Sequence, residues 1–189
     1  MLTVGAAVCG VAGMAHAVPI TGDITFAGGV ELDTSSAGTA TEVLSWTGPG
    51  GTGEPIVISD DGSFSGIAPG TEASFTSPWL FNSGAVAALW SVGGFTFDLT
   101  ESHIVFQGGS PAGVLVDGTG TVSGNGLDAT EMTWSFTTQD PSASGDESSI
   151  FSFSAASGTV TAVPDGGTTA MLLGLGVLAL GMLKKQMFA

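Results

Sequence analysis

The chain has few side chains that could act as a catalytic base or as a soft metal ligand. It has two histidines and one cysteine, and His103 is the only one of the three outside the first 16 residues. A Ser-His-Asp triad needs a histidine that contacts both partners, and common zinc sites need at least two histidines or cysteines. We therefore expect His103 to be a surface histidine without a catalytic role, and we expect no zinc site.

The acidic residues could support two other kinds of chemistry, namely glycoside hydrolysis by a carboxylate pair and calcium binding. A sugar-cleaving cleft commonly also contains Arg, Lys, Tyr or His, and the middle of the chain offers only His103. Loops at residues 60–61, and at Asp140 together with 146–147, carry carboxylates without the twelve-residue spacing of a calcium loop. We expect solvated acidic turns, a protein that is not an enzyme, and no metal or cofactor.

The charge balance excludes nucleic acid as a partner. The chain has 17 Asp and Glu against two Lys and Arg, which gives a formal net charge of −15. The two basic residues are Lys184 and Lys185, at the C-terminal end, so no basic surface is left to neutralise phosphates. Hydrophobic residues make up 43% of the chain, with 11 Phe and four Trp, which indicates a folded domain.

Short apolar runs recur through residues 18–162, separated by Gly, Pro, Asp and Ser. Apolar residues alternate with polar ones at 95–99, 132–136 and 151–155, a period typical of half-buried strands. Roughly ten such strands at intervals of about eight to twelve residues indicate a sandwich or barrel. We predict an all-β domain, an antiparallel β-sandwich of jelly-roll-like or similar topology, with a core that includes Phe97, Trp134, Phe136 and Phe153.

Residues 1–17 have the pattern of a secretory signal peptide. An uncharged run of small and apolar residues ends at Met14, and Ala15 and Ala17 stand at the two positions that signal peptidase reads. No basic residue precedes the run, which a start codon assigned too late would explain. We predict cleavage after Ala17, which removes Cys9 and leaves a mature protein without disulfides.

Residues 163–189 form a separate C-terminal segment. Val163, Pro164, Asp165, Gly166 and Gly167 are followed by an apolar run at 170–183 and then by Lys184 and Lys185. At about 1.5 Å per residue this run approaches the thickness of a bilayer core when the lysines snorkel. We predict a transmembrane-like apolar helix that holds the precursor in the inner membrane, with its basic end in the cytoplasm.

The order of motif, apolar run and basic pair resembles the PEP-CTERM sorting signal of exported Gram-negative bacterial proteins. Asp165 stands where the usual Val-Pro-Glu-Pro motif has Glu, so the segment is nearer the variant Val-Pro-Asp-Ser-Gly, with Gly166 in place of Ser. The resemblance implies recognition by exosortase, a membrane protease-transpeptidase. This enzyme would cut near the motif and release or re-anchor the body at the cell surface or in the extracellular matrix.

These features predict a signal peptide at 1–17, a β-sandwich domain at 18–162 and a sorting signal at 163–189. We expect a non-enzymatic surface or matrix protein whose partners are signal peptidase, exosortase, the membrane before processing, and exopolysaccharide. The alternative is a carbohydrate-binding module associated with exopolysaccharide, which would stack exposed indoles on sugar rings. The candidates are Trp46, Trp79, Trp90 and Trp134. Alternation places Trp90 and Trp134 in the core, and Trp79, which follows Pro78, is the one we expect to be exposed. Four buried tryptophans would favour the first function, and a planar exposed row the second.

Overall fold

A computed structural model describes residues 18–140 and 150–159 of the chain. The described part is built from strands, and its only helix is a single 3-10 turn at Gly62–Phe64. The strands are β1 (Asp23–Leu32), β2 (Glu42–Thr47), β3 (Ile56–Asp60), β4 (Ser74–Phe75), β5 (Trp79–Leu80), β6 (Val86–Val92), β7 (Phe95–Gly109), β8 (Ala112–Gly124), β9 (Leu127–Gln139) and β10 (Ile150–Thr159).

The prediction of an all-β, antiparallel fold is confirmed. Within the described ranges no helix is long and apolar enough to cross a bilayer. The predicted apolar helix at 170–183 lies outside the described residues. The predicted domain boundaries lie at or beyond the ends of those residues and stay predictions.

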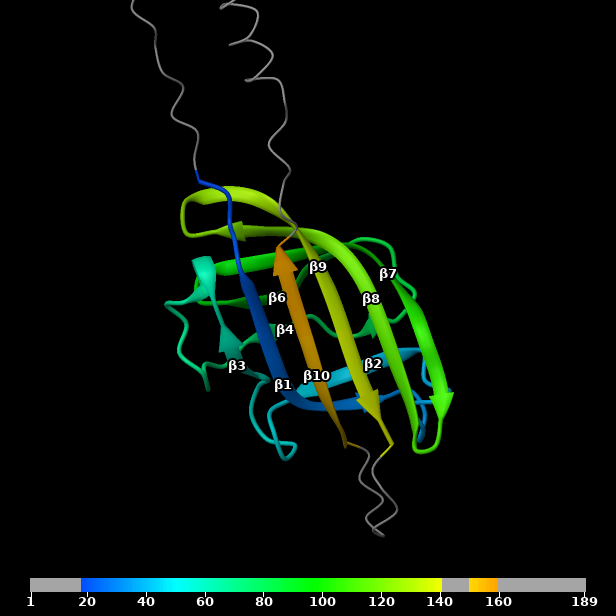
Figure 1. The fold of residues 1–189 in the computed structure, drawn as a ribbon. Helices are drawn as coiled ribbons and strands as arrows, with labels where there is room; N and C mark the ends of the chain where they lie inside the picture. Colours follow the sequence, from blue (N-terminus) through cyan, green and yellow to red (C-terminus); the bar gives the residue numbers. More distant parts are fainter. Residues whose placement is uncertain (1–17, 141–149, 160–189) are drawn as a thin grey trace, which may run out of the picture.

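The strands form one antiparallel sheet in the order β4-β6-β7-β8-β9-β10-β1-β2-β5, and Figure 1 shows that this sheet curls round on itself. The two faces expected of a sandwich therefore belong to one sheet. Strand β1 pairs with β10 along one edge and, along the other, first with β3 and then with β2. The change of partner occurs beside Gly28, where a Cβ atom would collide with the Thr47 carbonyl oxygen.

The two ends of the sheet are joined by a short stretch of chain. Strands β4 and β5 stand at opposite ends of the strand order, yet only residues 76–78 separate them in sequence. Thr76 donates its N–H to Leu89 O on β6 (2.9 Å), and its carbonyl oxygen accepts the Trp46 indole N–H from β2 (2.9 Å). This stretch therefore links the sheet's ends across the core.

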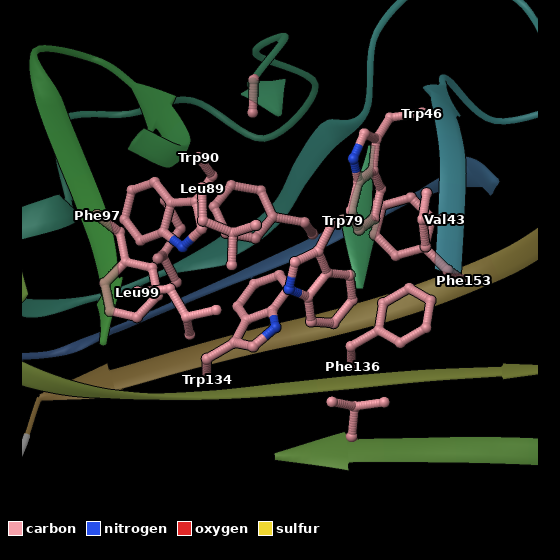
Figure 2. Close-up of a cluster of buried hydrophobic side chains, with 14 of the residues drawn as sticks. Val43, Trp46, Trp79, Leu89, Trp90, Phe97, Leu99, Trp134, Phe136 and Phe153 are labelled. Atoms are coloured by element: carbon pink, nitrogen blue, oxygen red, sulfur yellow. The ribbon is translucent and has the colours of Figure 1, made fainter. Parts of the chain in front are cut away.

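Aromatic side chains dominate the core enclosed by the curled sheet, as Figure 2 shows. Phe97, Trp134, Phe136 and Phe153 are all buried, as predicted. The ring centroid of Phe136 lies 5.3 Å from that of Trp79 and 5.7 Å from those of Trp46, Phe81 and Phe153. Because these rings come from β2, β5, β9, β10 and the chain after β5, one packed cluster holds distant parts of the sequence together.

The expectation that Trp79 is exposed is wrong, because its side chain has no solvent-exposed surface. Trp79 pairs with Val43 at the end of the sheet, and alternation along β5 turns it inward and Leu80 outward. Its ring contacts the rings of Trp46 and Trp134, with centroids 5.9 and 6.1 Å away.

Candidate functional site

The first candidate region is the end of the sheet where the C-terminal segment leaves the domain. Thr159, at the end of β10, bonds to Gly22 just before β1, so both ends of the domain meet there. Val163 follows only four residues later. The predicted processing residues Ala15, Ala17, Val163, Pro164, Asp165, Gly166, Gly167, Lys184 and Lys185 all lie outside the described residues.

The tryptophans do not form a platform for sugar rings. Trp46, Trp79, Trp90 and Trp134 are at most 8% exposed and belong to one core cluster. Their indole N–H groups also face inward: that of Trp90 donates to Ser157 Oγ (3.1 Å), and those of Trp79 and Trp134 are buried without a partner. Of the two arrangements expected from the sequence, the structure therefore has four buried tryptophans and not a planar exposed row.

The second candidate region contains His103. On the outer face of the sheet, His103 of β7 is paired across to Asp117 of β8, and Asp117 is paired in turn to Ser135 of β9. These are the three residue types of a catalytic triad, but the aspartate is in the middle. Since neighbouring strands are about 4.8 Å apart, the backbones of His103 and Ser135 are separated by about 9.6 Å. A triad needs its histidine against the serine, so this row does not have triad geometry.

A hollow of about 430 Å³ lies over this row and over the neighbouring row of Glu101, Thr119 and Thr133. Its outward-facing polar residues come from β7, β8 and β9, and are Glu101, His103, Asp117, Thr119, Thr133 and Ser135. The Thr133 hydroxyl donates to Gly158 O (3.1 Å), whereas the other five side chains make no hydrogen bond within the described part of the chain. This grouping has no signal in the sequence, because it depends on the register of three strands.

Other carboxylates are occupied by the protein itself. Asp61 Oδ1 accepts the N–H of Asp23 (2.8 Å), and Asp140 accepts the N–H of Ala37 (2.6 Å) and the hydroxyl of Ser36 (2.8 Å). Both belong to loops that were weighed as calcium sites. Among the described residues, no three His, Cys, Asp or Glu side chains come together as metal ligands. The two carboxylates hold loops in place.

Asp33 is a further acid with a role in the fold. Its carboxylate accepts hydrogen bonds from the hydroxyl group of Thr41 (2.7 Å) and from the N–H groups of Thr41 (2.9 Å) and Glu42 (3.3 Å). Partial burial raises the pKa of Asp33, but the hydrogen bonds from Thr41 and Glu42 outweigh it, so the pKa lies below its ordinary value. The ionised carboxylate therefore closes the loop between β1 and β2.

Comparison with known proteins identifies the C-terminal segment. Residues 162–187 match the family model of the VPDSG-CTERM motif, a PEP-CTERM-like sorting signal. The match includes every predicted motif residue from Val163 to Gly167 and both terminal lysines, and it confirms the resemblance found in the sequence. No curated protein and no solved structure matches the chain. The tail thus marks an exported protein that exosortase processes.

Proposed function

We propose that this protein is a non-enzymatic component of the cell surface or extracellular matrix, delivered there by exosortase processing of its tail. The observation that carries the proposal is the VPDSG-CTERM motif at residues 162–187, directly behind a compact β domain. Before processing, the apolar run at 170–183 would hold the precursor at the inner membrane. After processing, the β domain would be the part that reaches the outside.

The end of the domain supports this division of the chain. Strand β10 ends at Thr159 and lies inside the sheet between β9 and β1. A cut at the motif would therefore remove no part of the sheet. Four residues of extended chain span at most about 14 Å, so exosortase would have to work close to the folded end around Gly22 and Thr159.

A non-enzymatic role is supported by how the chemically capable residues are used. The row of His103, Asp117 and Ser135 has the wrong order for nucleophilic catalysis. Asp61 and Asp140 are engaged by backbone N–H groups of their own domain. Most of the large aromatic side chains are buried in the core, where they stabilise a domain that would have no disulfide after signal cleavage.

The test is mass spectrometry of the exported protein in a host that has the matching exosortase and in the same host without it. With exosortase present, we expect an N-terminus at Val18 and no peptide that contains Lys184. Pro164→Ala should block cleavage, whereas Thr161→Ala, just before the motif, should leave it unchanged. An exported protein that keeps its intact tail in the presence of exosortase would overturn the proposal.

A further inference from the structure

A second hollow lies on the same outer face, beyond the one around His103. It has a volume of about 290 Å³, and its lining includes Phe106, Leu115, Thr137, Gln139 and several glycines of the β7–β8 hairpin. Phe106 is 54% exposed, an unusual position for a phenylalanine in a chain that buries most of its aromatic rings. None of the residues that line this hollow is charged.

The two hollows lie over successive rows of the same three strands, and we call the two together the trough. Phe106 is paired across to Leu115 and Leu115 to Thr137, in the row next to that of His103, Asp117 and Ser135. Because Leu115 and Asp117 are two residues apart on β8, both face outward. From Gly113 to Thr119 the trough is about 20 Å long, and its lining comes from β7, β8 and β9, which lie side by side in Figure 1.

The trough is apolar at one end and rich in hydrogen-bond acceptors at the other. Phe106 and Leu115 form the apolar end, at the β7–β8 hairpin. At the other end, the carboxylates of Glu101 and Asp117 have no partner within the described residues, unlike that of Asp140. A carboxylate accepts hydrogen bonds only, so these groups suit a ligand that carries many donors. A ligand with one apolar face and many hydroxyl groups fits both ends.

Charge narrows the choice of ligand. The described residues contain no lysine or arginine, so an anionic polymer would meet repulsion and no counter-charge. A second copy of the domain would be repelled for the same reason. A polycation would find carboxylates at one end only, because the Phe106 end has no charged lining residue. An uncharged, linear chain of sugar rings meets none of these objections, because its hydroxyl groups can donate hydrogen bonds to the carboxylates and its ring faces can pack against Phe106.

We infer that the trough binds a segment of a neutral, linear polysaccharide, with the Phe106 ring against a sugar ring and with Glu101 and Asp117 accepting hydrogen bonds from sugar hydroxyl groups. This inference deepens the proposed function, since it names what the displayed domain would hold. Figure 1 places the β7–β8 hairpin at the end of the domain opposite to the start of β1 and the end of β10. A domain tethered through its C-terminal end would therefore keep the Phe106 end of the trough free.

The test measures binding of the purified exported protein to insoluble cellulose and to soluble amylose and β-1,3-glucan, with chitosan and alginate as cationic and anionic counterparts. We expect retention on at least one neutral glucan. Phe106→Ala should weaken that binding by about tenfold or more, and Asp117→Asn by about threefold or more. Leu80→Ala, at an apolar side chain of similar exposure on β5, and Asp128→Asn, at an acid outside the trough, should bind like the wild type.

Three results would overturn the inference: no binding to any neutral glucan, equal binding by Phe106→Ala, or binding confined to chitosan and lost as NaCl rises to about 0.5 M. Sedimentation of the wild type checks the remaining occupant, because a dimer that Phe106→Ala dissociates would make the trough a contact between copies. Cleavage of the tail is read separately by mass spectrometry. If the wild type binds no sugar but its tail is cleaved normally, the inferred binding at the trough is refuted and the proposed function is not.

Discussion

Gly22 and Thr159 hydrogen-bond to each other across 137 positions of sequence. The N–H of Gly22 donates to Thr159 Oγ1 (3.0 Å), and the N–H of Thr159 donates to Gly22 O (3.0 Å). Gly22 has a φ of 109°, and a Cβ there would crowd the Asp61 carbonyl oxygen, so glycine is required. These bonds close the domain at the end where the predicted signal peptide and the sorting signal are attached.

Removing the Thr159 hydroxyl should weaken this closure. In Thr159→Val the shape is kept, but the Gly22 N–H loses its acceptor, so we expect the free energy of unfolding to fall by about 1 kcal/mol. Thr159→Ser keeps the hydroxyl and should lose less. Urea unfolding of the exported protein measures both variants. A valine variant as stable as the wild type would show that water replaces the hydroxyl at no cost.

Phe136 should be among the most sensitive core positions. It is fully buried and packs against the rings of Trp46, Trp79, Phe81 and Phe153. Phe136→Ala should cost about 3–5 kcal/mol, a large share of the stability of an ordinary domain. Phe106→Ala removes the same atoms from an exposed site and should change stability by less than about 0.5 kcal/mol. Equal losses in the two variants would contradict the burial assigned to them.

Local patterns in the sequence were enough to predict the strands and the sorting signal. Alternation correctly placed Phe97, Trp134 and Phe136 inside, because a strand's period of two depends only on its own residues. The motif at 162–187 is contiguous, so it could also be found without the fold. Trp79 was misplaced because its burial depends on pairing with Val43, and no local signal reports that pairing.

The trough could not be predicted, because two bulges reset the alternation of β7. After Leu99, strict alternation would turn Glu101 and His103 inward, but the register shifts between Leu99 and Glu101 and again between Ile104 and Phe106. The first shift turns His103 outward, and the second restores the original alternation, in which Phe106 faces outward. Whether a strand bulges depends on its partner strand, so the grouping with Asp117 appears only in three dimensions.

A further bulge gives a prediction in which two neighbouring substitutions act in opposite directions. Ala88 has a φ of 50°, and its N–H donates to Asp98 Oδ1 (2.7 Å) across the irregular pairing of β6 with β7. Glycine adopts this conformation without strain, so Ala88→Gly should raise the free energy of unfolding by about 0.5–1 kcal/mol. Ala87→Gly, where φ is not positive, should lower it by a similar amount. Thermal unfolding compares the two, and a loss of stability in both would refute the strain at Ala88.

The pH dependence of stability should show a contribution from Asp33. Its folded-state pKa is lowered by hydrogen bonds from Thr41 and Glu42, against an unfolded value of about 3.9. The ionised carboxylate therefore adds stability that is complete above about pH 5 and is lost as the pH falls through the folded pKa. We expect the free energy of unfolding of the wild type to exceed that of Asp33→Asn by more at pH 6 than at pH 3.

The hydroxyl donor of this group provides the matched test. Thr41→Val removes one of the three hydrogen bonds to Asp33, so its stability should fall less steeply with acidification than that of the wild type. Chemical denaturation at several pH values measures the slopes. If the free energies of unfolding of Asp33→Asn and the wild type differ by the same amount at both pH values, the fold does not stabilise the ionised form of Asp33.

The acidic residues should make stability depend on salt, and removing one of them should have opposite effects according to whether its carboxylate holds a hydrogen bond in the fold. The described residues carry many carboxylates and no lysine or arginine, so their repulsion destabilises the folded state and salt should screen it. We expect the melting temperature to rise between about 0.01 and 0.15 M NaCl, as the Debye length falls from about 30 to 8 Å.

Glu131→Gln, at an exposed acid without a partner in the described part, should gain up to about 0.5 kcal/mol in the free energy of unfolding at low salt. Asp140→Asn should instead lose about 1–2 kcal/mol, because its carboxylate holds Ser36 and Ala37. A melting temperature that falls with added salt would mean that the carboxylates are stabilised by hydrogen bonds or bound cations more than they repel one another.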